Sequence, residues 1–174
     1  MRMLRRSALT LLLLLLALLP AGCQPPLSGT LPATPTAEQV AITVYFTDSN
    51  RYAEAIEPFE VAVSRMAPAG SNLPEAVLTE FFRGPTAEEA EQGLAAITSG
   101  ATGFQALRID EDGVAYVTLE GPCSSMGATY TIAQPLMKNL RQFPDIDYVK
   151  IYDAEGQTGQ PEGLSDSIPF CLEP

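Results

Sequence analysis

The chain has 174 residues, 46% of them hydrophobic and 18% charged, and 21 acidic against 10 basic residues give a formal net charge of −11 at pH 7. This acidic balance argues against nucleic acid or anionic lipid surfaces as partners, because binding to either begins with lysine and arginine. The chain has no histidine, which excludes Ser-His-Asp and Cys-His catalytic machinery and removes a common general base and metal ligand. We therefore expect no catalytic residues, no metal and no cofactor.

Residues 1–22 predict an export signal, because three arginines precede a leucine-rich block that ends in small residues. The block is shorter than the about 20 apolar residues of a transmembrane helix. The segment Ala21-Gly22-Cys23 resembles a bacterial lipobox, although Pro20 stands where a lipobox usually has leucine. We expect cleavage after Gly22 and a lipid on Cys23; the alternative is an ordinary secretory signal with a free cysteine. The protein would then be exported and held by its lipid at the outer face of the cell membrane or within the cell envelope.

The next segment, residues 23–40, is rich in proline, threonine, serine and glycine. Such a composition cannot bury enough apolar surface to fold, so the segment is predicted to be a tether. A single domain over residues 41–174 would follow it. Three of the ten basic residues lie in the export signal, so residues 23–174 carry seven basic and 21 acidic residues, a formal charge of −14.

Two strands are predicted at the start of the domain, over residues 41–50 and 58–68, with a polar loop over 49–57 between them. A helix over 72–83 follows. Asn72 and Glu75 stand at capping-box spacing, and Pro74 suits the first turn. One face of this helix is apolar and should pack on the sheet; it comprises Leu73, Val77, Leu78, Phe81 and Phe82.

The helix should end at Gly84-Pro85-Thr86. Gly84 suits the left-handed position just past a helix end, and Pro85 cannot continue the helix. Thr86 and Glu89 form a second capping box, which predicts a short helix ahead of Gly93-Leu94. A phosphate-binding loop would need several glycines and usually a lysine, so we interpret the segment as structural.

Residues 104–121 predict a hairpin, with two alternating strands around an Asp112-Gly113 turn. Asp110 to Asp112 are acidic, but the ligand spacing of an EF-hand is missing. Residues 131–143 predict another helix, in which Pro135 lies in the first turn or kinks a longer helix. Its apolar face comprises Ile132, Leu136, Leu140 and Phe143. A last strand is predicted over 145–156.

This order of elements predicts an α+β domain, with two main helices packed on one face of a small mixed β-sheet. Four motifs together resemble the GerMN domain, which occurs in sporulation and spore-germination proteins and in many bacterial envelope lipoproteins. They are Gly84-Pro85-Thr86, Gly93-Leu94, Asp112-Gly113 and Gln142-Phe143-Pro144. The resemblance covers residues 41 to about 156. It implies a non-enzymatic envelope module whose fold is similar to domains that build protein assemblies. Sporulation factors of this family often carry two such domains, and this chain has room for one, so a sporulation role is not implied.

Two cysteines lie in the predicted domain, Cys123 and Cys171. In an exported chain such a pair is most simply a disulfide, which would attach the C-terminal tail to the loop before the last helix. Closing that loop would stabilise the fold by about 4 kcal/mol in the chain-entropy model. The alternative makes Cys123 a nucleophile near a helix N-terminus.

Two functional hypotheses remain. The first is an interaction module that binds an envelope protein or copies of itself through its sheet, an edge strand or the loop 123–130. Candidate contacts in that loop are Ser124, Ser125, Thr129 and Tyr130. The second is a binder of a cell-wall glycan or peptide that uses tyrosines for stacking, chosen from Tyr45, Tyr52, Tyr116, Tyr130, Tyr148 and Tyr152. An enzyme that uses paired carboxylates ranks third, because no pair stands in a recognisable site.

Overall fold

A computed structural model of the protein describes residues 38–174. The predicted export signal, Cys23 and most of the predicted tether lie outside the described residues. The first strand begins at Gln39, two residues before the predicted start of the domain. Within the described part of the chain, no helix is long and apolar enough to cross a membrane.

The first sheet has the strand order β2-β1-β3 and is antiparallel throughout. Its strands are β1 (Gln39–Asp48), β2 (Glu60–Pro68) and the two-residue β3 (Leu94–Ala95). The β1–β2 register is unbroken from end to end. Alternate residues of β1 are buried on the inner face; they are Ile42, Val44 and Phe46.

The predicted loop between β1 and β2 is partly wrong, because it contains the short helix α2 (Ser49–Ala53). The cause is the N-cap residue Asp48. Its carboxylate accepts hydrogen bonds from the backbone N–H groups of Asn50, at 2.9 Å, and Arg51, at 3.1 Å, which satisfies donors that the first helical turn leaves open.

The longest helix is α3 (Leu73–Arg83), and its predicted apolar face is confirmed, with Val77, Leu78 and Phe81 fully buried. The predicted capping box at its start is wrong. Asn72 is the N-cap residue, but its side chain makes no capping hydrogen bond, so the proline in the first turn and the packing of the apolar face define this helix start.

The second main helix is α5 (Ala133–Leu140). Pro135 lies in its first turn, as one of the two alternatives had it. The predicted apolar face is confirmed: Ile132, Leu136 and Leu140 are fully buried, and Phe143 packs against the core just beyond the helix.

The second sheet has the order β4-β5-β6. Strands β4 (Gly103–Ile109) and β5 (Val114–Glu120) form the predicted antiparallel hairpin, and β6 (Tyr148–Tyr152) pairs parallel to β5. Gly113 has a positive φ of 75° in the hairpin turn, which glycine adopts without strain.

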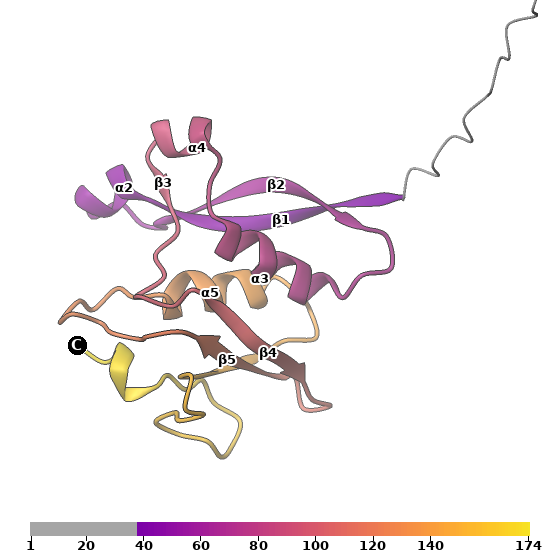
Figure 1. Cartoon of the computed structure of the whole chain (residues 1–174), viewed down its shortest axis with the longest axis vertical. Helices are drawn as coiled ribbons and strands as arrows, with labels where there is room; N and C mark the ends of the chain where they lie inside the picture. The colour runs from indigo at the N-terminus through magenta and orange to yellow at the C-terminus, as the bar shows by residue number, and fades with distance from the viewer. Residues whose placement is uncertain (1–37) are drawn as a thin grey trace, which may run out of the picture. The chain divides into compact units, whose positions relative to one another are not determined.

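The α+β class is confirmed, but the strands form two three-stranded sheets instead of one. Figure 1 shows α3 and α5 between these sheets. Both sheets have an apolar inner face, Ile42 to Phe46 on β1 and Ala115 to Leu119 on β5. The two helices therefore cover two sheets, and one continuous core forms between them.

The C-terminal tail covers the far side of β6. Ser167 forms a parallel bridge to Lys150, and the backbone N–H of Ile151 donates to the Ser167 carbonyl at 2.9 Å. The Lys150 side chain is fully buried, and its ammonium donates to the backbone carbonyls of Gln160, at 2.8 Å, and Glu162, at 3.1 Å. A buried cation thus holds the tail on this sheet.

Candidate functional site

The Gly-Pro-Thr segment, residues 84–86, joins α3 to the short helix α4 (Ala87–Glu91). Gly84 has φ 85°, as predicted, but its ψ of 177° is extended and not left-handed helical. The predicted capping box is confirmed, because Thr86 Oγ1 accepts from the Glu89 N–H at 3.3 Å and Glu89 Oε2 accepts from the Thr86 N–H at 2.8 Å.

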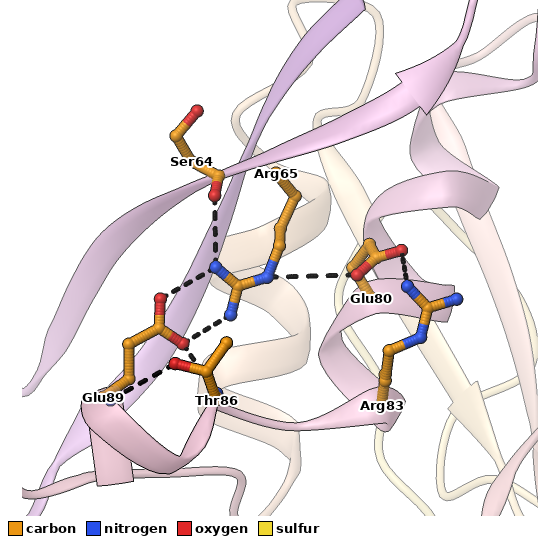
Figure 2. A network of polar contacts seen from close by, with 6 residues as sticks. All are labelled: Ser64, Arg65, Glu80, Arg83, Thr86 and Glu89. Carbon is orange, nitrogen blue, oxygen red and sulfur yellow. Dashed lines mark hydrogen bonds and ion pairs between the residues drawn. The ribbon is translucent and has the colours of Figure 1, made fainter. Parts of the chain in front are cut away.

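Glu89 also links α4 to β2, as Figure 2 shows. The Arg65 guanidinium donates to both oxygens of the Glu89 carboxylate, at 2.8 and 2.5 Å, and its Nε lies 3.9 Å from Glu80, which Arg83 contacts from the other side. The hydrogen bond from Arg65 lowers the pKa of Glu89 to about 2, and the same bond raises the pKa of Arg65. The motif therefore has a structural role: its polar groups fix α4 to β2.

The other motif residues also have structural roles, in turns and in the core. Gly93 has φ 97°, a backbone conformation that glycine adopts without strain, and a Cβ there would also lie 2.5 Å from the side chain of Asn50, which would have to move. Leu94 is buried in β3. At the hairpin, the Asp110 carboxylate accepts from the N–H groups of Val114 and Asp112, and these bonds, the one from Val114 foremost, lower its pKa. The Asp110 carboxylate is thus hydrogen-bonded to backbone groups of its own turn.

The Gln-Phe-Pro motif helps to close the far edge of β1. Gln142 donates to the Thr43 carbonyl at 3.1 Å. One helical turn earlier, Asn139 Oδ1 accepts from the Tyr45 N–H at 2.8 Å and Asn139 Nδ2 donates to the Tyr45 carbonyl at 2.9 Å. Two side chains thus replace a neighbouring strand. Asn139 is fully buried and was missed from the sequence, since a single polar residue within a helix carries no sign of such a role.

The opposite edge of the first sheet, on β2, is open. The hydrogen bonds at the two ends of the β1–β2 pair show which residues of β2 bond to β1. The Asp48 N–H donates to the Phe59 carbonyl, and the Ala69 N–H donates to the Glu38 carbonyl. In an antiparallel ladder such hydrogen-bonded pairs recur every second residue. The odd-numbered residues of β2 therefore face β1, and the even-numbered ones direct their N–H and C=O groups outward. We call this outward side of residues 60–68 the open edge.

The open edge is accessible to solvent. Ala62, Ser64 and Met66 are all exposed, and Met66 is 52% exposed. Among the described residues, the one polar contact to their backbone is from the Arg65 guanidinium to the Ser64 carbonyl, at 3.1 Å. The N–H groups of all three residues and two of their carbonyls thus have no partner in residues 38–174.

A groove of about 390 Å³ lies between the end of β2 and α3. We call it the β2–α3 groove. Its walls include Met66, Ala67 and Pro68 on one side and Glu75, Thr79 and Arg83 on the other. The strand side is mostly apolar and the helix side is polar. Glu75 is exposed and forms no ion pair with the described residues.

The predicted binding loop, residues 123–130, is attached to the C-terminal tail. The structure contains the Cys123–Cys171 disulfide, so Cys123 is not a free nucleophile. The Ser125 hydroxyl donates to the Glu173 carbonyl at 2.6 Å, and Ser124 Oγ accepts from the Met126 N–H at 3.2 Å. The polar groups of both serines are used within the fold.

The other two candidates in this loop contact different elements, Thr129 the helix α5 and Tyr130 the first sheet. The Thr129 carbonyl accepts from Gln134 at 3.1 Å. The Tyr130 hydroxyl donates to Glu60 at 2.6 Å and lies 3.0 Å from Thr47 Oγ1. Burial raises the pKa of Tyr130, and the hydrogen bond to Glu60 raises it further, so this phenol stays a donor at neutral pH.

Tyr130 belongs to an aromatic cluster with Tyr52 and Phe59, whose ring centroids lie 5.1 to 5.6 Å apart. Tyr52 is 45% exposed. The six predicted stacking tyrosines are therefore not one surface: Tyr116 and Tyr152 stack on each other in the second sheet, with Arg108 3.7 Å above Tyr116.

The geometry defines a small α+β domain with two sheets, whose sequence motifs shape turns and close edges. A family model described as "Germane: Sporulation and spore germination" matches residues 43–160. This is more than half of the chain, and the protein belongs to that family. The resemblance to the GerMN domain is thereby confirmed.

The chain is also similar to solved structures, among them two of GerMN domains. The chain is similar to the tandem GerMN domains of the sporulation protein GerM from Bacillus subtilis, at 18% identity and a TM-score of 0.51, over 80% of this chain and 48% of that one. It thus spans about half of the tandem protein. It is also similar to the first GerMN domain of that protein, at 23% identity and a TM-score of 0.48, over 75% of this chain and 98% of that one. No curated protein gives a significant match.

Proposed function

We propose that the protein is a non-enzymatic, lipid-anchored interaction module of the bacterial cell envelope, which binds an envelope protein or copies of itself. The observation that carries this proposal is that part of the outer face of the first sheet is uncovered. Ala41, Ala62, Ser64 and Met66 are exposed there, while both main helices pack on the inner side. The small side chains of Ala41, Ala62 and Ser64 allow another protein surface to approach this face closely.

The cellular setting rests on the sequence. The lipobox-like segment ending at Cys23 supports a lipid anchor, and the Cys123–Cys171 disulfide suits an oxidising compartment outside the cytoplasm. The formal charge of −14 after residue 22 favours solubility and disfavours nucleic acid.

Crosslinking of the native, membrane-attached protein, followed by mass spectrometry, tests the proposal. We expect one recurring envelope protein, or the protein itself, and a Cys23→Ala variant should be released from the membrane. Crosslinks scattered over unrelated proteins would contradict an interaction role. Retention of the Cys23→Ala variant at the membrane would contradict the anchor alone.

The aromatic cluster favours a second candidate, a binder of cell-wall glycan or peptide. A hollow of about 430 Å³ lies nearby, between Glu60 and residues 134–141 of the α5 region, and Tyr52 offers an exposed ring for stacking. Thermal unfolding with a panel of wall fragments separates the two candidates. A shift that disappears in a Tyr52→Ala variant would support ligand binding, and no shift across the panel would count against it.

A further inference from the structure

We propose that the open edge of β2 binds an extended, basic segment of a partner protein as an additional strand, with one of its side chains in the β2–α3 groove. This inference rests on the proposed interaction role and names the surface and the partner's chemistry. The added strand would pair with the outward N–H groups of Ala62, Ser64 and Met66 and with the carbonyls of Ala62 and Met66, while Arg65 holds the Ser64 carbonyl.

The open edge is suited to strand addition because the N–H groups of Ala62, Ser64 and Met66 have no partner within residues 38–174, although the Arg65 guanidinium occupies the Ser64 carbonyl. Strands at sheet edges are usually protected by bulges, by charged side chains or prolines, or by a covering segment. The nine pairs between Gln39–Thr47 and Glu60–Pro68 contain no register shift, and the outward residues Ala62, Ser64 and Met66 carry no charge. Proline occurs only at the strand end, as Pro68.

The other long strands have such protection. On β4 the register shifts between Phe104 and Ala106, which leaves a bulge at Gln105. The free side of β6 is covered by the tail, where the Ser167 N–H donates to the Val149 carbonyl at 3.1 Å. The far side of β1 is closed by α5 and β3. Strand addition is therefore favoured at β2 over these strands.

The β2–α3 groove gives the added strand a place for a side chain. Side chains of a strand alternate between its two faces, so every second residue of a segment beside β2 would point toward α3. Ala67 and Pro68 provide apolar contact there, while Thr79 and Glu75 provide polar contact. Main-chain hydrogen bonds would supply affinity, and this groove would supply selectivity, as in other cases of strand addition.

Charge favours a basic segment of a different protein over a second copy of this chain. Glu80 is already compensated by Arg83 and Arg65, which leaves Glu75 as the unpaired charge in the groove. Two copies would each bring a formal charge of −14 after the export signal and would repel each other. A lysine or arginine in the bound segment would instead lie opposite Glu75.

The test uses the full-length, membrane-attached protein with a photo-crosslinking residue at Ser64, and a matched control with the same residue at Gln105 on the β4 edge. Crosslinked peptides are mapped by mass spectrometry. We expect one recurring partner segment that contains lysine or arginine, captured from position 64 and not from position 105.

Two variants make the result specific. Ala62→Pro removes an outward N–H but none that faces β1, so the sheet should form and capture should be lost. Glu75→Lys should reduce capture about three- to tenfold, the range expected from reversal of one charge at a partly exposed contact. The control, Glu111→Lys, makes the same charge change at the hairpin tip and should leave capture unchanged. If Ala62→Pro does not fold, the comparison of the two lysine variants decides.

The outcomes separate this inference from the proposed function. A recurring partner that maps to another face, or capture of a second copy from position 64, would overturn the inference and leave the interaction role standing. No specific partner at any face would overturn both. Capture that is equal from positions 64 and 105, or unaffected by Glu75→Lys, would also overturn the inference.

Discussion

Replacement of Asn139 by alanine tests how the first sheet is held to the helices. The Asn139 side chain is the partner of both backbone groups of Tyr45 on the closed edge of β1, at 2.8 and 2.9 Å. It also donates to the Pro135 carbonyl one turn earlier in the helix. Alanine keeps the helix and removes all three hydrogen bonds.

The expected loss follows from the groups left without partners. A polar group that loses its partner in the interior costs about 1–3 kcal/mol, and two such groups on Tyr45 would remain. The Pro135 carbonyl keeps its ordinary helical hydrogen bond. Alanine has a higher helix propensity than asparagine, which offsets about 0.5 kcal/mol. We therefore expect Asn139→Ala to lower the free energy of unfolding by about 3 kcal/mol, or the melting temperature by roughly 10 °C.

Urea unfolding followed by circular dichroism measures this change, with Lys138→Ala as the matched control. Lys138 is the neighbouring residue, is exposed, and contacts the Tyr45 ring through its ammonium at 5.1 Å, so its loss should cost less than about 1 kcal/mol. Hydrogen exchange should also show a faster Tyr45 amide in Asn139→Ala alone. Equal stability of the two variants, with the Tyr45 amide still protected, would refute the reasoning.

Three other predictions concern the remaining contacts. Because the folded pKa of Glu89 is about 2 against an ordinary 4.5, its pairing with Arg65 stabilises the fold above pH 4.5 and is lost as pH falls toward 2. Glu89→Gln should therefore be less stable than the unmodified protein at pH 6, with a gap that narrows in urea titrations between pH 4.5 and 2; a constant gap would contradict this. A reducing agent should lower the stability of the unmodified protein by up to about 4 kcal/mol and leave a Cys123→Ser, Cys171→Ser variant unchanged, as differential scanning calorimetry can measure. In hydrogen exchange by NMR, even-numbered amides of residues 60–67 should exchange faster than odd-numbered ones, and uniform protection would show that the edge is covered.

Local sequence patterns predicted much of the fold. Alternation of apolar residues indicated β1, β2 and the β4–β5 hairpin, because a half-buried strand requires that period. The helix over 72–83 was evident from its apolar face, and Thr86 with Glu89 indicated the start of α4 because a capping box is formed by residues close in sequence. The GerMN motifs also indicated the family, because four separate motifs of the chain resembled those of the GerMN domain.

Features that depend on distant parts of the chain were not predictable in this way. The pairing of Asn139 with Tyr45 spans 94 residues, and no local pattern marks either residue. The strands divide into two sheets, and this division depends on which strands pair with each other. The number and order of strands in the sequence do not reveal that pairing. The role of Glu89 was only half predicted: its capping bond is local, but its ion pair with Arg65 needs the folded chain.

The protected edges and the acidic surface support a common interpretation of the open edge. Closing the other edges requires buried polar groups such as Asn139 and Lys150, which are costly unless every bond is made. One lysine in place of Ala62 or Ser64 would protect β2 more simply, yet neither position carries a charge. An edge with free N–H groups invites association between identical chains, and a strong net negative charge opposes it. Together these features keep copies apart while leaving the edge free for a segment of opposite charge, which is the discrimination that a selective strand-binding surface requires.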